Sequence, residues 1–181
     1  RYWDLASFAN GEPQRFTGDA EAIEALGAEL DRAVRTQLVS DVPIGALLSG
    51  GIDSSTVCQR MTRFNNSRVR TFSAGFRDES FSELPFARQV AGYLGTEHTE
   101  RDIAPDLDAE LPGLAWFYDE PFADTSAIAT YLLCKTTREH VKVVLSGDGG
   151  DELFAGYTTY LADRLQAIYR LLVPGPLHRG M

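Results

Sequence analysis

The most constraining feature of the sequence is a regular alternation of short β-rich runs with helical patterns. Apolar and β-branched residues concentrate in four runs that are expected to form strands, namely Ile44–Leu48, Val69–Gly75, Glu97–Arg101 and Val141–Leu145. Apolar residues at helical spacing follow each of the first three strand runs, with two such stretches after the third. Helices are therefore expected at Ser54–Phe64, Ser82–Leu94, Leu107–Phe117 and Thr125–His140. This alternation predicts an α/β fold with a parallel, doubly wound sheet, helices on both faces and right-handed crossovers.

Further helices are expected on either side of this alternating region. An amphipathic pattern predicts an N-terminal helix over Asp19–Val39, and another predicts a single final helix over Leu153–Leu172 that ends before Pro174. Residues 1–17 have mixed character and are interpreted as an arm or linker. A chain of 181 residues can bury one full core, so residues 18–181 are expected to form one domain.

A Ser-Gly-Gly loop follows the first expected strand. Gly50 and Gly51 allow a tight turn in which backbone N–H groups converge on an anion, and the start of the next helix favours negative charge. Ser49 and Ser54 add hydroxyl groups. Asp53 would repel a phosphate unless a cation lies between them, and Mg²⁺ bound by carboxylate and phosphate oxygens would explain it.

A second loop of the same build follows the last expected strand. It carries Ser146 and Gly147, then Asp148, a glycine pair and Asp151. The carboxyl ends of parallel strands meet at one edge of a sheet, where α/β folds bind ligands. We therefore expect Asp53 and Asp151 to face each other across a metal–pyrophosphate complex.

Other interpretations of these loops remain open. A lone Ser-Gly-Gly before a helix is often only a tight turn, and Asp148 could simply cap a helix or close its loop. Neither loop fits the Gly-x4-Gly-Lys-Ser/Thr phosphate loop, and neither fits the Gly-x-Gly-x-x-Gly pattern of dinucleotide sites. Two copies, each after an apolar strand and each followed by a carboxylate, favour a functional role.

The loops also resemble those of a known family. The segment Ser49–Ser54 resembles the pyrophosphate loop of the N-type ATP pyrophosphatases. LLSGGIDSS and VVLSGDGGDELFAGY together resemble the synthetase domain of glutamine-dependent asparagine synthetases, as do TFSAGF at 71–76 and FSELPFARQVAGYLGTEH at 81–98. The likeness covers most of residues 1–160 and implies an adenine nucleotide alpha hydrolase-like fold of the Rossmann-like HUP type.

The resemblance implies a reaction in two steps. ATP and aspartate would form a β-aspartyl-adenylate and pyrophosphate, and ammonia would then displace AMP to give asparagine. It also implies a role for each matching residue, with Leu47 and Ala74 lining the adenine nucleotide and Ser146 and Gly147 near the ribose and α-phosphate.

The remaining implied roles concern the reacting groups. Ser49, Gly50, Gly51 and Ser54 would hold the pyrophosphate, Asp53 and Asp151 would bind Mg²⁺, and Asp148 would be the base toward the incoming amine. Glutamate is common in the family at the position of Asp148, so this chain departs from the family pattern by one methylene group.

The resemblance further implies a domain context. Family members begin with a glutaminase domain that releases ammonia, and they continue with further helices and a lysine near the reacting phosphate. This chain resembles the linker and a C-terminally truncated synthetase domain, without the N-terminal glutaminase domain. We expect it to bind ATP–Mg²⁺ but to form little or no asparagine alone. A β-lactam synthetase-like enzyme, a lasso-peptide-cyclase-like enzyme and an inactive nucleotide-binding module remain alternatives.

Composition limits the kinds of partner that this chain is expected to bind. The net charge of -9 argues against nucleic-acid binding, because a duplex-binding surface needs clustered Lys and Arg. No apolar run is long enough to span a membrane, so a cytoplasmic location is expected. Cys58 and Cys134 fit no disulfide or metal pattern and are interpreted as buried thiols. The expected partners are small molecules and the glutaminase domain, and homodimer formation stays open.

Overall fold

The computed structural model describes residues 4, 6, 14–76, 82–103, 106–120, 122, 124 and 126–172. Most of the expected arm at residues 1–17, and Pro174 beyond the last helix, lie outside these residues. None of the helices within the described ranges is both long and apolar enough to cross a membrane.

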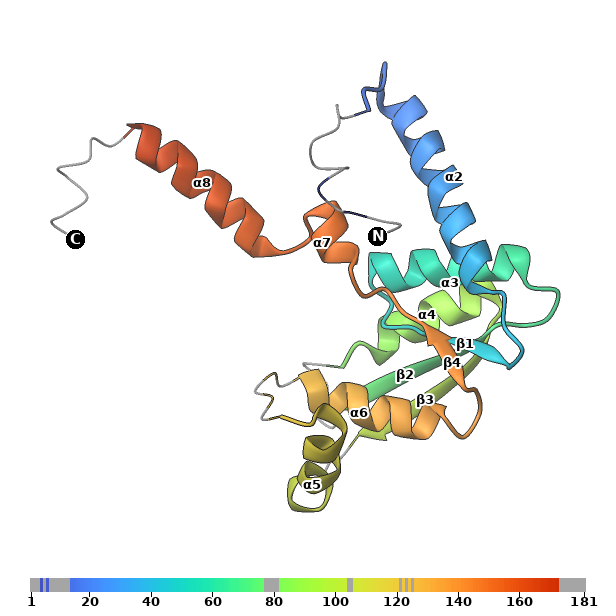
Figure 1. Cartoon of the computed structure of the whole chain (residues 1–181). Coiled ribbons are helices and arrows are strands. Elements are labelled where there is room, and N and C mark those ends of the chain that lie inside the picture. Colours follow the sequence, from blue (N-terminus) through green and yellow to red (C-terminus); the bar gives the residue numbers. More distant parts are fainter. Residues whose placement is uncertain are drawn as a thin grey trace, which may run out of the picture.

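A four-stranded parallel sheet forms the centre of the structure (Figure 1). Its strand order is β3-β2-β1-β4, and its strands are β1 (Ile44–Leu47), β2 (Arg70–Phe76), β3 (Glu97–Ile103) and β4 (Val143–Leu145). In the register, Ala46 of β1 lies opposite Thr71 of β2 and Leu145 of β4. The predicted parallel α/β sheet is therefore confirmed.

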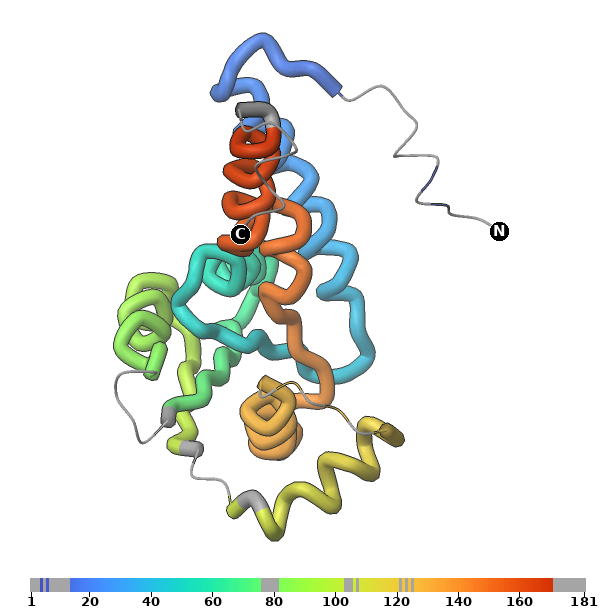
Figure 2. Tube along the Cα trace, turned by 90° about the vertical axis from the view of Figure 1, so that its left-hand side faces the viewer, coloured from blue at the N-terminus to red at the C-terminus, as the bar shows by residue number. Residues whose placement is uncertain are grey.

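Helices cover both faces of this sheet. The helices that pack on it are α3 (Ile52–Phe64), α4 (Leu84–Leu94) and α6 (Ser126–Thr137). Helix α2 (Asp19–Gln37) packs on α3, and α5 (Leu107–Tyr118) packs on α6. The short α7 (Gly150–Phe154) follows β4, and α8 (Thr158–Leu172) extends away from the sheet (Figure 1). The path β1–α3–β2–α4–β3 crosses the sheet in one direction, so right-handed crossovers put α3 and α4 on the same face. The return from β3 to β4 places α6 on the other face, apart from α3 and α4 (Figure 2).

The hydrophobic core lies mainly between the sheet and the α3–α4 layer. Apolar side chains from β1, α2, α3, α4 and the start of β2 meet there, and the buried members are Val34, Ala46, Leu48, Cys58, Met61, Val69, Ala87 and Ala91. Burial of the Cys58 thiol raises its pKa to about 12, as expected for an inert thiol. The prediction for Cys134 was wrong, because its position on α6 leaves it exposed.

The prediction of one continuous final helix was also wrong. The chain forms a short α7 and then α8, and between them Ala155 adopts the left-handed conformation with φ 57°. Only glycine fits at the next position, because a Cβ on Gly156 would lie 1.9 Å from Asp151 Oδ1. Gly156 lets the chain turn closely over this carboxylate, and its N–H donates to the Asp151 carbonyl at 3.0 Å.

Two smaller boundary predictions were wrong as well. Helix α6 ends at Thr137 and not at His140, because turn residues follow it. Strand β4 begins at Val143 and not at Val141, and Lys142 instead donates its N–H to the Pro43 carbonyl at 3.4 Å.

His98 on β3 is a largely buried titratable group that couples the fold to pH. Its Nδ1 lies 2.9 Å from the hydroxyl of Thr71, and its Nε2 has no hydrogen-bond partner in the described part of the chain. Burial is the main cause that lowers the pKa of His98, and the charge of Arg88 also lowers it. Glu100, which pairs with Arg88 at 2.6 Å, opposes this shift in the His98 pKa.

We predict that the free energy of unfolding decreases as the pH falls through about 6.5, the ordinary pKa of histidine. The unfolded chain then binds a proton on His98 that the folded chain binds only at lower pH, so acid favours unfolding. Urea denaturation at several pH values measures this. His98→Asn should lose this part of the pH dependence and His140→Asn should keep it. Equal pH dependence in wild type and His98→Asn would contradict the prediction.

Candidate nucleotide-binding site

The candidate site lies where the winding of the sheet changes direction. Strands β1 and β4 are neighbours, yet α3 leaves β1 on one face of the sheet and α6 leads into β4 from the other. In doubly wound sheets, a cleft forms at the carboxyl ends of two such strands. Both glycine loops of the sequence follow these two strand ends.

The first loop is held in shape by its own serines. Ser49 donates its backbone N–H to Ser54 Oγ at 3.2 Å, and the two hydroxyl oxygens lie 2.9 Å apart. The N–H of Gly51 donates to Ser49 Oγ at 3.2 Å. Because Gly51 is the N-cap residue of α3, it offers no side chain to the first N–H groups of that helix. These N–H groups are therefore available to an anion.

Gly50 has a different role from the other loop residues. Its φ is 86°, and a Cβ at this position would lie 2.5 Å from the carbonyl carbon of Phe86 and 2.6 Å from the N of Ala87. Gly50 therefore packs the loop against the first turns of α4, a contact that no residue with a side chain could make. It is not among the residues that line the cleft.

The second loop is a tight turn with Asp148 at its tip. Gly150 donates its N–H to the Gly147 carbonyl at 3.1 Å, and Gly149 has φ 88° and ψ -5°. These values at the third position of a four-residue turn are typical of type II, which needs glycine there. The hydroxyl of Ser146 donates to Asp148 Oδ2 at 2.9 Å.

The two loops are in direct contact. A Cβ on Gly147 would lie 2.7 Å from the backbone N of Ser54, and one on Gly150 would lie 2.4 Å from Cγ and Oδ2 of Asp53. Only glycine allows this close approach, by which the second loop packs on the first turn of α3. The expected meeting of the two loops at one sheet edge is confirmed.

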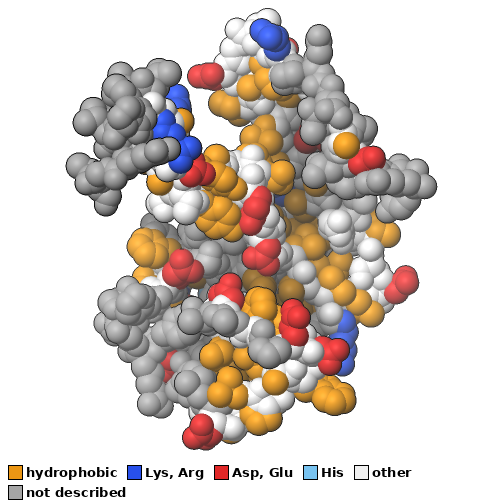
Figure 3. Space-filling view, turned by 60° about the vertical axis from the view of Figure 1, so that its left-hand side comes forward, with side chains coloured by type: hydrophobic (Ala, Val, Ile, Leu, Met, Phe, Trp, Pro, Cys, Tyr) orange, Lys and Arg blue, Asp and Glu red, His pale blue; other side chains and the backbone are white. Residues whose placement is uncertain are grey.

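A cleft of about 1020 Å³ opens over these loops. Apart from Gly50, every predicted site residue lines it, and these residues are Leu47, Ser49, Gly51, Asp53, Ser54, Ala74, Ser146, Gly147, Asp148 and Asp151. Asp53 and Asp151 thus share one cleft, as the ATP-site prediction requires. Figure 3 shows the face that carries acidic side chains among apolar ones. The role of each residue stays a prediction.

The cleft is acidic and contains no compensating cation among the described residues. Glu83 joins Asp53, Asp148 and Asp151 in its lining, and no Lys or Arg does. Within the same residues, no cluster of three or more His, Cys, Asp or Glu side chains could hold a metal by itself. Carboxylate oxygens are suitable ligands for Mg²⁺, which usually completes its shell with phosphate oxygens and water. The site therefore suits Mg²⁺ that arrives with a polyphosphate.

Several cleft residues carry no motif in the sequence. Ala129, Thr130 and Leu133 form a wall on α6, and Leu26 and Leu30 approach from α2. Only the return of the chain across the far face of the sheet brings α6 to this edge. No signal in the local sequence distinguishes these side chains from ordinary helix-packing residues.

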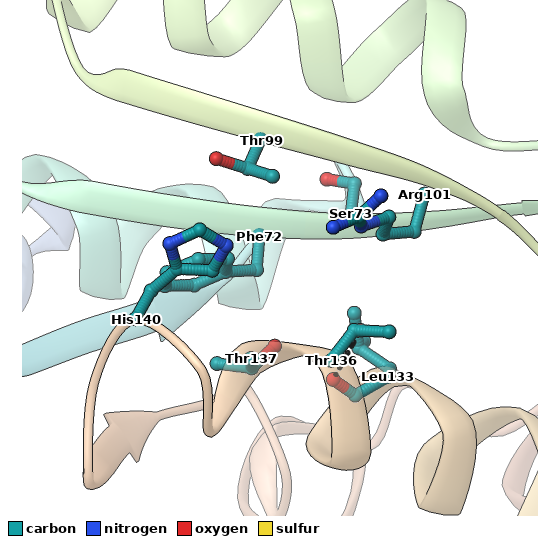
Figure 4. A pocket seen from close by; sticks show the side chains of 8 residues that line it. All are labelled: Phe72, Ser73, Thr99, Arg101, Leu133, Thr136, Thr137 and His140. Carbon is teal, nitrogen blue, oxygen red and sulfur yellow. Dashed lines mark hydrogen bonds between the residues drawn. The ribbon is translucent and has the colours of Figure 1, made fainter.

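A second hollow, between β2, β3 and α6, is not a ligand site. Figure 4 shows its lining, in which the rings of Phe72 and His140 have centroids 5.6 Å apart. The hollow leaves no room for a water molecule. The hydroxyl of Thr137 is buried there without a partner in the described part of the structure. The hollow is a packing gap behind the cleft.

Comparison with solved structures supports the fold. NMN synthetase from Francisella tularensis has a TM-score of 0.52 at 16% identity, over 74% of this chain and 58% of that one. The glutamine-dependent NAD⁺ synthetase from Acinetobacter baumannii in complex with ADP has a TM-score of 0.50 at 22% identity, over 86% of this chain and 31% of that one. At these identities the likeness shows the fold alone, which is adenine nucleotide alpha hydrolase-like.

Comparison of sequences identifies the family. The family model described as asparagine synthase matches residues 25–179. Glutamine-hydrolysing asparagine synthetase 1 of Bacillus subtilis (strain 168) is 42% identical over 153 residues, which are 84% of this chain and 24% of that protein. A putative glutamine-hydrolysing asparagine synthetase 2 of Methanocaldococcus jannaschii is 41% identical over 166 residues, 88% of this chain and 30% of that protein.

The chain thus spans about a quarter of the length of the Bacillus relative. The matched region contains the four strands, both glycine loops and most of the cleft lining. The chain belongs to the asparagine synthase family.

Proposed function

We propose that this chain is the ATP-binding synthetase part of an asparagine synthetase. In this proposal, the cleft binds ATP and aspartate, the β-carboxylate of aspartate attacks the α-phosphate, and pyrophosphate leaves. Ammonia then attacks the resulting acyl-adenylate, and AMP leaves as asparagine forms. The observation that carries the proposal is the direct contact of the two glycine loops around Asp53, in one cleft with Asp151.

Adenylation is needed because a free carboxylate is a poor acyl donor until it gains a good leaving group. The protein's task is to position the reactants and to stabilise the negative charge that develops on pyrophosphate. The start of α3, which has no side-chain cap, would supply backbone N–H donors for that charge. Asp148, at the tip of the second loop, lines the same cleft and would accept a proton from the attacking amine.

Mg²⁺ is part of the proposed site. Asp53 and Asp151 would hold it, since both line the cleft and neither pairs with a cation in the described part of the chain. When bound, Mg²⁺ neutralises charge on the phosphates and stabilises the departing pyrophosphate. It would also remove the repulsion between the acidic cleft and the triphosphate.

The proposed function includes a larger assembly. The relatives named above are about three to four times longer than the part matched here. We propose that residues 1–17 are a linker, that residues 18–181 belong to the synthetase domain, and that a glutaminase domain supplies ammonia in a cytoplasmic enzyme. A cation for the phosphates would come from outside the described cleft residues.

We predict that Asp53→Asn weakens ATP–Mg²⁺ binding by about tenfold or more, because one of two proposed carboxylate ligands is lost. Binding of ATP without Mg²⁺ should not weaken, since the substitution removes a negative charge near the phosphates. Titration calorimetry on the 181-residue chain measures both affinities. Asp163→Asn on α8, outside the cleft, is the matched control. Equal ATP–Mg²⁺ affinity in Asp53→Asn and wild type would refute the metal role.

We also predict that Gly150→Ala lowers both stability and ATP–Mg²⁺ affinity. The added methyl group would lie 2.4 Å from the Asp53 carboxyl group, so the loops must separate or Asp53 must turn away. Overpacking of this kind costs about 1–3 kcal/mol. Thermal unfolding and calorimetry test the variant against Gly92→Ala, whose new methyl group would meet nothing within 4 Å. The prediction fails if the two alanine variants bind ATP–Mg²⁺ equally well.

The proposed substrate is tested by exchange of labelled pyrophosphate into ATP in the intact enzyme that contains this domain. Aspartate should support exchange, because adenylation of its carboxylate is reversible, and glutamate or β-alanine should not. Omission of Mg²⁺ should abolish the exchange. If another carboxylic acid supports exchange and aspartate does not, the asparagine assignment is wrong even though the adenylation chemistry stands.

A further inference from the structure

Asp148 lies in a turn whose backbone is held in place at both ends. The turn that carries it is anchored at both ends, because Gly147 packs against the backbone of Ser54 and Gly150 packs against Asp53. The hydrogen bond from Gly150 N–H to the Gly147 carbonyl closes the turn at 3.1 Å. The direction of the Asp148 carboxylate therefore depends on its two side-chain torsions and on what holds them.

The hydroxyl of Ser146 is what holds the side chain. It donates to Asp148 Oδ2 at 2.9 Å, and the N–H of Asp148 lies 3.4 Å from the same hydroxyl oxygen. No salt bridge engages Asp148 within the described ranges, so this contact sets the orientation of an otherwise exposed carboxylate. Hydrogen bonds to charged groups are about twice as strong as those between neutral groups.

The carboxylate also lies within electrostatic reach of the facing wall of the cleft. Burial is the main cause that raises the pKa of the Cys134 thiol on α6, and the negative charge of Asp148 raises it further. Ser146, Asp148 and the neighbouring α6 residue Leu133 line the same cleft. Asp148 and the α6 residue Leu133 thus border the same cleft, in which the proposed function places the acyl group.

From this geometry we infer that Ser146 is a positioning residue for Asp148 in the amide-forming step. The inference rests on the proposed function, in which Asp148 accepts a proton from the attacking amine. The pairing suits aspartate in particular, because a glutamate carboxylate would stand one methylene group farther from the backbone and from the Ser146 hydroxyl.

This role differs in its consequences from the nucleotide contact that the family resemblance implies for Ser146. A nucleotide contact acts in adenylation and in every later step. A positioning role for Asp148 acts only when the amine attacks. The two steps are measured separately, by pyrophosphate exchange and by asparagine formation from ammonia.

The test uses Ser146→Ala in the intact enzyme, at saturating ATP. Asparagine formation from ammonia should fall about tenfold more than aspartate-dependent pyrophosphate exchange does, which corresponds to the loss of one charge-assisted hydrogen bond in the amide-forming step. Ser146→Thr, which keeps the hydroxyl, should retain most of the amide-forming rate. Equal losses in exchange and amide formation, or no loss in either, would overturn the inference.

A double-substitution cycle separates the positioning role from a general structural effect. With Asp148→Asn already present, Ser146→Ala should cause no further loss of amide formation, because no base remains to be oriented. With Asp148→Glu present, Ser146→Ala should cost less than about threefold. Equal factors in the wild-type, Asp148→Asn and Asp148→Glu backgrounds would show that Ser146 acts independently of Asp148.

Crystal structures of the wild type and Ser146→Ala decide the inference without an activity measurement. In Ser146→Ala, the Asp148 side chain should adopt a different orientation, while the backbone of the turn at 147–150 should not move. An unchanged carboxylate would refute the positioning role. Absence of pyrophosphate exchange with every carboxylic acid in the wild type would instead refute the proposed function, so the two failures are distinguishable.

Discussion

The close approach of the second glycine loop to the first turn of α3 is the contact on which the site depends. Gly147 and Gly150 bring their α-carbons against Ser54 and Asp53 at distances that leave no room for a side chain. This contact joins the ends of two neighbouring strands, β1 and β4, at the point where the winding of the sheet reverses. It creates a common floor for the cleft and fixes the backbone on which Asp148 stands.

Charge gives the cleft its chemical character. Its described lining has carboxylates from both loops and from Glu83 but no Lys or Arg. An isolated triphosphate would be repelled by such a surface, whereas under the proposed function a triphosphate that carries Mg²⁺ would meet two acidic groups and the backbone N–H donors at the start of α3. Backbone donors cost no side-chain entropy and are fixed before the ligand arrives. In this proposal, the acidic residues bind the metal and the glycine loops bind the phosphates of the same ligand.

The sequence predicted the main elements well because their signals are local. Apolar strands followed at once by Ser-Gly turns and helices indicated the two loops and their place at one sheet edge. Errors arose where distant contacts decide the structure. The predicted final helix is interrupted at Ala155, where Gly156 packs closely against the Asp151 carboxylate. Cys134, expected to be buried, lies exposed on α6.

The sequence by itself determined the parallel α/β architecture, the two glycine loops and the residue types available to the chemistry, because periodicity and glycine placement act over a few residues. Tertiary structure alone decided that Thr130 and Leu133 of α6 form a cleft wall, and that the glycines of one loop rest on Asp53 and Ser54 of the other. It also decided that the Ser146 hydroxyl donates a hydrogen bond to the Asp148 carboxylate. Such contacts depend on the positions of fixed backbones in space, which local preferences do not specify.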